Sequence, residues 1–374
     1  MRVLILSCNT GEGHNSSGKA VQEAFARRGI PCEMEDAFRF ISSGISSFIS
    51  YGFVRVYRHL PGLFRFGYRY SEEHPGVFSE RSGIYKMITA GAERLYHFIR
   101  DEGYDTVVCT HVFSGLITTE ILRRYHIPLR TYFVATDYTC SPSCAEGELD
   151  AYFIPDESLK DDFVRCGIPR EKLVASGIPI REAFFQSEGA ANAKRSIGLT
   201  PDCRHLLVMC GSMGCGPIRE LVRLISWILP EDCHISVICG TNHHLRKKLE
   251  RDHARQPRIH IYGFVKNIPA MMDSADLYLT KPGGISTTEA GRKKLPMVFV
   301  DAVAGCETYN MRFFTEKGAA VTADTPEELA ILTVALLNDQ DVLNRMSAAC
   351  SDFLHRSPAE LICDRILQDR TVNL

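Results

Sequence analysis

The chain twice runs from a short apolar stretch through a glycine-rich turn into a helical pattern, and this repeat constrains the fold more than any other feature. The first copy begins with the apolar residues 3–6, and we expect Asn15 or Ser16 to cap its helix and Gly29 to end it. The second copy occupies residues 205–217. A buried strand that turns directly into a helix opens a parallel βαβ unit, so the sequence predicts an α/β protein. Such turns also place helix N-termini, which attract anions, after strand ends.

Further apolar stretches of strand length alternate with helical patterns in both halves of the chain. They lie at 105–110, 130–135 and 150–154 in the first half and at 234–239, 258–262, 276–280 and 296–300 in the second. The stretch Ser-Gly-Ile-Pro-Ile at 176–180 interrupts both patterns and marks a boundary. We therefore expect two doubly wound, Rossmann-like domains, residues 1–179 and 180–374, with an interdomain cleft. Helices after Glu327 can pack back on the first domain.

The composition is that of a globular enzyme and argues against other classes of protein. Of the 374 residues, 45% are hydrophobic and 24% are charged, and the formal net charge of −2 argues against a nucleic-acid binder. No apolar stretch has the length of a membrane span, and Glu12 and His14 follow the first stretch too soon for a signal peptide. We expect a cytoplasmic protein with no nucleic-acid partner.

The cysteine pattern argues against both disulfides and metal binding. The chain has 14 cysteines, which are scattered and form no C-x-x-C pair, so we expect buried, reduced thiols. Cys140 and Cys144, with His111, are a weak zinc pattern because a second pair is missing. The D-x-D triplet at 339–341 is expected to cap a helix. The sequence therefore predicts neither a metal nor a cofactor.

The first glycine turn also fits the spacing of a Walker A loop. Gly13, Gly18 and Lys19 match G-x-x-x-x-G-K, but the next residue is Ala20. A P-loop NTPase needs a serine or threonine hydroxyl at that position to hold magnesium. We interpret the match as accidental, and His14 has no task in such a loop.

Three polar side chains of the first domain follow predicted strands directly. They are His14, His111 and Asp137. Ligands of open parallel sheets bind beyond the carboxyl ends of the strands, so these side chains can line one edge of a binding crevice. A histidine and a carboxylate at that edge can act as a general base and its orienting partner. The alternative, that His111 or Asp137 merely caps the next helix, stays open.

The second domain offers two sites for phosphate groups. Gly283 and Gly284 follow the strand at 276–280 and open a helix, and glycines allow backbone N–H groups to approach a phosphate closely. Glu289, one turn into that helix, is suited to accept hydrogen bonds from both hydroxyls of a ribose. The turn at 211–214 is expected to form a second anion site at another helix N-terminus. Two such sites in one domain suit a nucleoside diphosphate.

The order and spacing of these motifs resemble the monogalactosyldiacylglycerol synthase and processive diacylglycerol glucosyltransferase family. The motifs are Gly11-Glu12-Gly13-His14, Thr136-Asp137-Tyr138, Gly211-Ser212-Met213-Gly214, Gly263-Phe264-Val265, and Lys281-Pro282-Gly283-Gly284 with Glu289. The likeness extends from the first residues to about residue 320. It implies a GT-B glycosyltransferase whose second domain binds a UDP-sugar and whose first domain binds a lipid acceptor.

The resemblance also implies roles for individual residues. The uracil would lie against the backbone at Phe264 and Val265, and the segment 304–310 looks like the family's sugar-contacting loop. Cys306 stands where relatives usually carry glutamine, and the lost amide leaves the choice between glucose and galactose open. The implied UDP-hexose site comprises Gly211, Ser212, Met213, Gly214, Phe264, Val265, Gly283, Gly284, Thr288, Glu289, Gly305, Cys306, Glu307 and Asn310.

Transfer needs a base that takes the proton of the acceptor hydroxyl as its oxygen attacks the anomeric carbon. His14 is the first candidate, and Asp137 either orients it or is itself the base. The resemblance favours inversion, which gives a β-glycoside. The helix N-termini at 211–214 and 283–284, rather than a metal, would stabilise the leaving diphosphate.

Residues 41–69 mix aromatic side chains with arginines and contain no acidic residue. This composition is typical of a segment that binds an anionic membrane surface. With Gly13 and His111 on the acceptor side, the membrane candidates are Arg55, Arg58, Phe64 and Arg65. We expect a peripheral protein on the inner face of the cell membrane that takes a diacylglycerol-type acceptor. A pair of core helices with solvated arginines is the alternative.

Three other functions remain open on this sequence. They are a lipid-linked N-acetylglucosaminyltransferase of peptidoglycan synthesis, a UDP-sugar 2-epimerase and a non-enzymatic UDP-sugar sensor. An epimerase would form product from the donor alone, and a sensor would form none. Release of UDP that depends on diacylglycerol distinguishes the main prediction from all three.

Overall fold

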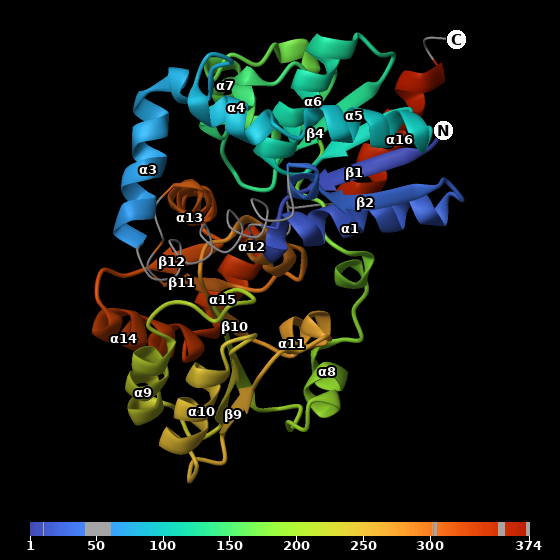
Figure 1. The fold of residues 1–374 in the computed structure, drawn as a ribbon. Coiled ribbons are helices and arrows are strands. Elements are labelled where there is room, and N and C mark those ends of the chain that lie inside the picture. The colour runs from blue at the N-terminus through green and yellow to red at the C-terminus, as the bar shows by residue number, and fades with distance from the viewer. Residues whose placement is uncertain (10, 42–60, 301, 303–304, 351–355, 372–374) are drawn as a thin grey trace. The chain divides into compact units, whose positions relative to one another are not determined.

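The computed structural model describes residues 1–9, 11–41, 61–300, 302, 305–350 and 356–371. The chain forms two compact units. The first comprises Met1–Glu182, Ala304–Tyr309 and Arg356–Leu374, and the second comprises Ala183–Val303 and Asn310–His355. Each unit contains a sheet of six strands, all of them parallel, with helices packed against it (Figure 1).

The sheet of the first unit has the strand order β2-β1-β3-β4-β5-β6. Its strands are β1 (Val3–Ser7), β2 (Cys32–Asp36), β3 (Thr106–Cys109), β4 (Arg130–Val134), β5 (Ala151–Ile154) and β6 (Leu173–Ala175). All five residues of β1 are buried, because this strand lies inside the sheet between β2 and β3 and helices cover it. β2 lies at an edge and carries Glu33, Glu35 and Asp36.

Helices and short 3₁₀ turns connect the strands of the first unit. The helices are α1 (Glu12–Arg27), α3 (Pro61–Glu73), α4 (Gly83–Thr89), α5 (Ala92–Asp101), α6 (Val112–Tyr125), α7 (Lys160–Arg165) and α16 (Pro358–Thr371). The 3₁₀ turns are η1 (Ala37–Phe40), η2 (Pro75–Phe78), η3 (Pro142–Glu146), η4 (Glu157–Leu159) and η5 (Arg170–Lys172), and η6 (Glu182–Phe185) spans the boundary between the first unit and the second.

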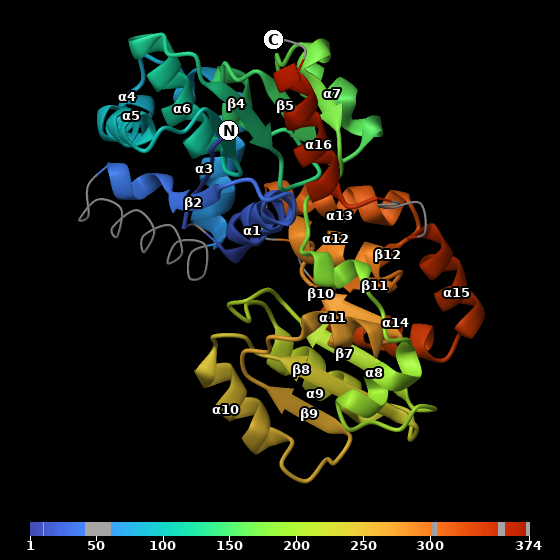
Figure 2. The same ribbon diagram turned by 90° about the vertical axis from the view of Figure 1, so that its right-hand side faces the viewer.

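The C-terminal helix α16 belongs to the first unit although the second unit precedes it in the chain. Ile362 and Ile366 of this helix are fully buried and share a core with Val21 and Phe25 of α1. Figure 2 shows α16 beside the elements of the first unit. Arg28, just after α1, bonds the carboxylate of Asp364 at 2.5 Å. The first unit therefore depends on the last helix of the chain for part of its core.

The sheet of the second unit has the order β12-β11-β10-β7-β8-β9. Its strands are β7 (Arg204–Met209), β8 (Cys233–Ile238), β9 (Ile259–Tyr262), β10 (Leu277–Thr280), β11 (Met297–Phe299) and β12 (Ala320–Thr322). Its helices are α8 (Ala190–Ser196), α9 (Ile218–Ile228), α10 (His243–Asp252), α11 (Ile268–Asp273), α12 (Gly284–Arg292), α13 (Cys306–Glu316), α14 (Pro326–Leu337) and α15 (Gln340–Ala349), and the first residues of α13 belong to the first unit.

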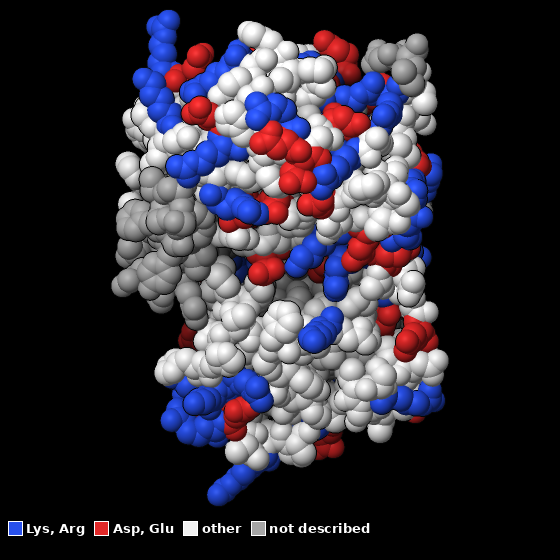
Figure 3. Space-filling model, turned by 45° about the vertical axis from the view of Figure 1, so that its right-hand side comes forward, with Lys and Arg blue, Asp and Glu red and all other residues white. Residues whose placement is uncertain are grey.

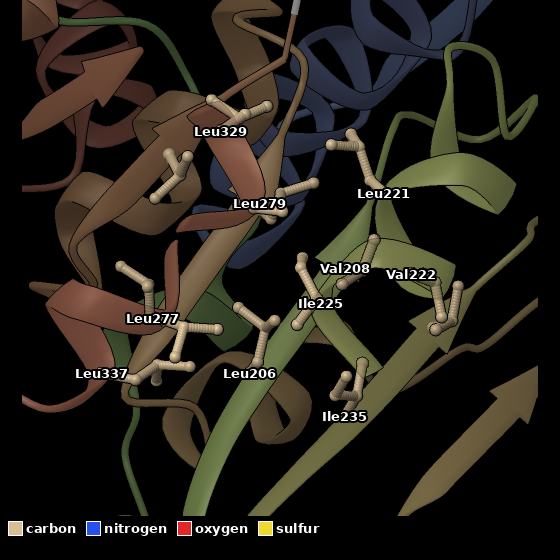
Figure 4. Packing of buried hydrophobic residues seen from close by; sticks show 14 of the residues in the cluster. Leu206, Val208, Leu221, Val222, Ile225, Ile235, Leu277, Leu279, Leu329 and Leu337 are labelled. Atoms are coloured by element: carbon tan, nitrogen blue, oxygen red, sulfur yellow. The ribbon is translucent and has the colours of Figure 1, made fainter. Parts of the chain in front are cut away.

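Leucine, isoleucine and valine side chains fill the core of the second unit. Leu206 of β7 and Leu279 of β10 are fully buried, and they pack with Ile225 of α9 and Leu337 of α14 (Figure 4). Burial of an aliphatic side chain of this size contributes about 2 kcal/mol each to stability. This packing fixes β7 and β10 side by side, so the turns that follow them lie at one edge of the sheet.

The α/β fold with two parallel sheets is confirmed, and one expectation about the first helix is wrong. Helix α1 begins at Glu12, with Gly11 in the position before it, so Asn15 and Ser16 lie inside the helix. Asn15 instead accepts a hydrogen bond from the Ser7 hydroxyl at 2.7 Å, which ties the helix to the end of β1. The structure also adds the edge strands β2 and β12.

Basic and acidic side chains lie intermingled over much of the face drawn in Figure 3, in keeping with a formal net charge of −2. Within the described ranges, no helix is long and apolar enough to cross a membrane. The D-x-D triplet caps a helix as expected, because the Asp339 side chain accepts a hydrogen bond from the backbone of Val342 at the start of α15.

Candidate functional site

His14 lies in the first turn of α1, directly beyond the end of β1. Its Nδ1 atom lies 2.8 Å from the carbonyl oxygen of Thr110 and 2.9 Å from the hydroxyl oxygen of Thr136. Thr110 follows β3 and Thr136 follows β4, so the carboxyl ends of three strands meet at this imidazole. A carbonyl oxygen only accepts hydrogen bonds, so Nδ1 carries the proton and Nε2 keeps its lone pair.

Burial lowers the pKa of His14, although the hydrogen bond to Thr110 acts in the opposite direction. The ring is therefore neutral near pH 7, and its Nε2 atom is available to accept a proton. A general base needs this state.

His111 is the residue before α6 and caps that helix, as one of the sequence interpretations held. Its Nδ1 atom accepts a hydrogen bond from the backbone N–H of Phe113 at 3.1 Å, so the proton of the neutral ring sits on Nε2. Burial, together with the charge of His14, holds the pKa of His111 well below its usual range. The two histidine rings meet edge to face, with 4.5 Å between their centroids. The site thus combines a free lone pair on His14 with a neutral N–H donor on His111.

The residues of the apparent Walker A loop have other tasks. Gly13 and Gly18 lie within α1, so the segment is helix and not a phosphate-binding loop. A side chain at Gly18 would meet the Met34 sulfur at 3.1 Å and the Ile5 side chain at 3.2 Å. Gly18 therefore allows α1 to pack closely on β1 and β2, and Lys19 points into solvent. The interpretation of the motif as accidental is confirmed.

Asp137 follows Thr136 and is half-buried beside Cys306. The Cys306 thiol hydrogen-bonds with the Asp137 carboxylate, and burial followed by the charge of Asp137 raises the pKa of that thiol well above its usual range. The partners that hold His14 at Nδ1 are Thr110 and Thr136. The structure therefore places Asp137 next to the residue that the resemblance assigns to sugar recognition.

Gly305 and Tyr68 form a close contact in the first unit. Gly305 has a φ of +94°, and a side chain there would lie 2.8 Å from the Tyr68 ring, so only glycine fits. Tyr309 donates a hydrogen bond from its hydroxyl to Glu72 at 2.9 Å, which also joins this segment to α3. The Tyr68 hydroxyl is buried and has no hydrogen-bond partner among the described residues.

The expected sugar-contacting segment divides between the two units. Gly305, Cys306 and Glu307 belong to the first unit, whereas Asn310 belongs to the second. Asn310 is fully buried and donates a hydrogen bond from its side-chain amide to the carbonyl of Pro282 at 2.9 Å. Glu307 is 7% exposed. The amide of Asn310 thus holds the turn before α12.

The turn between β10 and α12 has the features of an anion site. Gly283 is the residue before the helix, and the free N–H groups of the first turn of α12 follow it. Thr288 is buried and donates a hydrogen bond to the carbonyl of Gly284 at 2.6 Å. Glu289 is 8% exposed, so it is not an ordinary solvated helix residue.

The prediction that residues 211–214 form a helix N-terminus is wrong. The helix α9 begins at Ile218, and the four residues form a turn directly after β7. Gly214 has a φ of +54°, and a side chain there would lie 2.4 Å from the Cys239 carbonyl oxygen. Asn242 donates a hydrogen bond to the Gly214 carbonyl at 3.0 Å. Gly214 is needed because this turn packs against the loop after β8, whereas at Gly211 only the φ of +70° favours glycine. Ser212 and Met213 are half-buried in the turn.

The remaining candidate residues lie in other parts of the chain. Phe264 and Val265 follow β9, which β7 and β8 separate from β10, and the Phe264 side chain is 66% exposed. Arg55 and Arg58 lie outside the described residues. Phe64 and Arg65 lie on α3, and their side chains also fall outside the described part.

Sequence reasoning missed three functional candidates, Thr110, Thr136 as the partner of His14, and Tyr68. The first two follow predicted strands, and that position was the available signal. Tyr68 carries no such signal, since only the fold brings α3 to Gly305.

Two family models match the chain, one for each part. The model for monogalactosyldiacylglycerol (MGDG) synthase matches residues 14–180, and the model for the glycosyltransferase family 28 C-terminal domain matches residues 205–361. Curated proteins named processive diacylglycerol beta-glucosyltransferase match along the whole chain. Those of Bacillus mycoides (strain KBAB4) and Bacillus thuringiensis (strain Al Hakam) are 29% and 28% identical over 98% and 99% of this chain and 94% of their own length. The chain is therefore similar along nearly its whole length to these diacylglycerol glucosyltransferases.

Among solved structures, the MurG protein of Acinetobacter baumannii matches with a TM-score of 0.68 at 13% sequence identity, over 98% of this chain and 99% of its own. At that identity the likeness concerns the fold alone, which is GT-B. His14 is the first residue of the synthase match, and Glu289 lies inside the family 28 match.

Proposed function

We propose that this chain is a UDP-sugar-dependent hexosyltransferase that moves glucose or galactose to diacylglycerol or a related lipid. The substrate class rests on the family, because relatives named for diacylglycerol glucosyl transfer match over nearly the full length of the chain. The chemistry rests on one observation, the lone pair that remains on His14 Nε2 because Nδ1 bonds the Thr110 carbonyl.

His14 acts as the general base in this proposal. Its Nε2 atom takes the proton of the acceptor hydroxyl while the hydroxyl oxygen attacks the anomeric carbon and UDP leaves. Attack from the face opposite the leaving group inverts the configuration, so an α-linked donor yields a β-glycoside. The hydroxyl of Thr136 and the carbonyl of Thr110 keep the ring oriented through the proton transfer. Asp137 contributes through its contact with Cys306.

The donor binds to the second unit, residues 183–303 with 310–355, and the acceptor to the first. The N–H groups that open α12 after Gly283 and Gly284 stabilise the leaving diphosphate, and the turn at 211–214 contributes backbone groups from the neighbouring strand. Glu289 binds the ribose hydroxyls and Thr288 supports the turn. Phe264 and Val265 meet the uracil. The proposal assigns no step to a metal or cofactor.

Helix α3 supports a role for the first unit at a lipid surface. Leu63, Phe66 and Tyr70 are 55%, 67% and 46% exposed, and their spacing places them along one side of the helix. Phe66 stacks on Tyr70, which in turn stacks on His74. A row of exposed aromatic and aliphatic side chains is costly in water and favourable in the headgroup region of a bilayer. We place this helix against an anionic membrane, on its inner face, where the acceptor lies.

The decisive experiment measures UDP release by the full chain with and without diacylglycerol in vesicles. UDP-glucose, UDP-galactose and UDP-N-acetylglucosamine are compared as donors, and the lipid product is identified by mass spectrometry. The proposal expects UDP release only when both a UDP-hexose and diacylglycerol are present. An altered sugar formed from donor alone would identify an epimerase, and transfer only from UDP-N-acetylglucosamine to a prenyl-linked acceptor would identify the peptidoglycan reaction. Donor binding without any turnover would identify a non-enzymatic UDP-sugar sensor.

A further inference from the structure

The C-terminal end of α12 borders a pocket that the proposed reaction does not use. The pocket has a volume of about 200 Å³ and lies within the second unit. It is lined by residues 184–187, by Asp273 at the end of α11, and by Arg292, Lys293 and Lys294, where α12 ends. A helix rises 1.5 Å per residue, so Arg292 lies about 12 Å along α12 from Gly284, which opens the helix. The pocket is therefore separate from the proposed diphosphate turn.

Two of the lining side chains form a buried ion pair. The Nζ atom of Lys293 lies 2.7 Å from the carboxylate of Asp273, and the two side chains are only 3% and 10% exposed. Lys293 also donates to the backbone carbonyl of Gln186 at 2.5 Å, and the Ser187 hydroxyl donates to the Asp273 carboxylate at 3.2 Å. This network joins the ends of α11 and α12 to the segment before α8. It also pairs the charge of Asp273 with that of Lys293.

Arg292 carries a buried donor that no described residue satisfies. Its Nε atom is shielded from solvent and has no hydrogen-bond partner among the described residues. Its guanidinium carbon lies 4.8 Å from the centroid of the Phe185 ring, and this cation–π contact restrains the group. A buried N–H group without an acceptor costs free energy of folding, and guanidinium groups bind anionic oxygens more strongly than neutral ones. Arg292 therefore points to a ligand that supplies an acceptor.

Lys294 has a backbone conformation that usually belongs to glycine. Its φ is +55°, and its N–H group bonds the Gly291 carbonyl at 3.0 Å, which closes the last turn of α12. Glycine is the common residue at such a position after a helix, because a Cβ atom is strained in the left-handed region. The chain instead has a lysine there, whose side chain is exposed and lines the pocket. The turn itself does not require this side chain, whereas a site that needs positive charge does.

We propose that this pocket binds a phosphate group, either as the free ion or as part of a small soluble molecule. Of the eight residues that line the pocket, three are basic and one is acidic. Lys293 and Asp273 cancel each other, so the positive charges of Arg292 and Lys294 remain. The C-terminal end of α12 contributes only about half a negative charge and does not cancel them. A phosphate group, with a charge of about −1.5 to −2 near pH 7, matches the remainder.

The size of the pocket limits the ligand to few atoms beyond the phosphate group. Drug-sized ligands occupy pockets of about 300–1,000 Å³, and a water molecule takes about 30 Å³, so about 200 Å³ suits a phosphate ion or a small phosphate ester. In the bound state the guanidinium of Arg292 donates hydrogen bonds to the phosphate oxygens, and Lys294 supplies the second positive charge. The site does not rest on the proposed function, because none of its residues takes part in the proposed donor or acceptor site.

The site is tested by calorimetry on the full chain at constant ionic strength, with inorganic phosphate as the probe. Glycerol 3-phosphate is titrated in parallel, and its tighter binding would identify an esterified phosphate as the better ligand. Arg292→Met keeps the apolar stem beside Phe185 and removes the N–H groups, so the Kd for phosphate should rise about tenfold or more. Lys294→Gly should raise the Kd about threefold. Its Tm should stay close to that of the parent, because relief of backbone strain offsets the freedom that glycine gives the unfolded chain.

Arg345→Met is the matched control. Arg345 is exposed on α15, so this variant loses the same charge and should keep the parent Kd for phosphate. Phosphate binding that UDP displaces and that Arg292→Met leaves unchanged would place the anion at the donor turn and overturn the proposal. No saturable binding of either probe to the parent would also overturn it. Phosphate binding that Arg292→Met weakens, in a protein that shows no UDP release, would count against the proposed function alone.

Discussion

The carbonyl oxygen of Thr110 lies 2.8 Å from Nδ1 of His14 and thereby fixes which nitrogen of the ring carries the proton. A carbonyl oxygen cannot donate, so the neutral ring must donate to it and keep its other nitrogen bare. Thr136 approaches the same nitrogen from β4 with its hydroxyl oxygen at 2.9 Å. The state of the base is thus set by two residues that follow the strands β3 and β4.

Thr136→Val should slow transfer while His14 remains in place. The change keeps the shape of the side chain and removes one neutral hydrogen bond to the ring, so kcat should fall about fivefold, equivalent to about 1 kcal/mol. His14→Ala should lower kcat at least about a hundredfold, since a positioned general base contributes that much or more. Binding of UDP, measured by calorimetry, should be the same in both variants as in the parent.

Thr333→Val is the control for Thr136→Val. Thr333 is fully buried in α14, and its hydroxyl bonds the Leu329 carbonyl of its own helix at 2.7 Å. This variant should keep the parent kcat. An unchanged kcat in Thr136→Val, or near-normal turnover in His14→Ala, would contradict the assignment of the base.

Glu289→Gln should weaken donor binding and leave the acceptor site intact. The buried carboxylate accepts hydrogen bonds from the ribose in the proposal, and bonds to a charged group are worth about 1.5–3 kcal/mol, so the Kd for UDP should rise about tenfold or more. Calorimetry with UDP measures the change. Glu327→Gln, at an exposed position in the first turn of α14, provides the control. Equal UDP affinity in Glu289→Gln and the parent would exclude the ribose role.

Tyr68→Phe should separate stability from activity. The Tyr68 hydroxyl is buried without a partner among the described residues, close to the charged and polar groups of Asp137 and Cys306. An unsatisfied buried hydroxyl costs free energy of folding, so its removal should leave Tm unchanged or raise it slightly. If a bound substrate uses the hydroxyl, kcat/KM should fall about tenfold in the same variant. A fall in Tm together with unchanged kcat/KM would show a purely structural side chain.

The interior strands and the strand-end residues could be predicted from the sequence, whereas the edge strands β2 and β12 could not. Strand β1 shows an unbroken apolar run because helices cover both of its faces, but β2 reads Cys-Glu-Met-Glu-Asp and carries no such pattern at its edge position. His14 was identified from its place after β1. Its partners Thr110 and Thr136 are 96 and 122 residues away in the sequence. A local sequence pattern cannot predict contacts between residues so far apart in the chain.

The roles of the glycine turns could likewise be predicted only in part from the sequence. Gly283 precedes a helix as predicted, but Gly214 is required by a close approach to the Cys239 carbonyl oxygen. Both turns look alike in sequence because glycine serves phosphate binding and tight packing equally well. Likewise, Gly305 and Cys306 stand beside Tyr68 and Asp137, which the sequence separates by more than a hundred residues.

Helix α3 should govern membrane binding. Replacement of the exposed residues Leu63 and Phe66 together by glutamate places two charges where the proposal puts the headgroup region, so flotation with anionic vesicles should drop severalfold. Trp227→Glu is the control, because Trp227 is 81% exposed on α9 of the second unit. Full binding of the α3 variant, or an equal loss in the control, would contradict the assignment to α3.

The stability of the chain should fall as the pH decreases from 6.5 to 4, in part because of His205. This residue lies in β7 and is fully buried, its Nδ1 atom bonds the Ser274 carbonyl at 3.1 Å, and burial lowers its pKa to about 4. Lys194, His260 and His234 face it and act in the same direction. Because the unfolded chain binds this proton near pH 6.5 and the folded chain only near pH 4, the contribution is complete above pH 6.5. It is lost progressively as the pH falls to 4 and amounts to about 3 kcal/mol.

Urea unfolding at pH 7 and pH 4.5 should show a larger loss of unfolding free energy for the parent than for His205→Asn, whose amide can replace the Nδ1 donor. Identical losses in the two proteins would show that His205 does not carry this pH dependence.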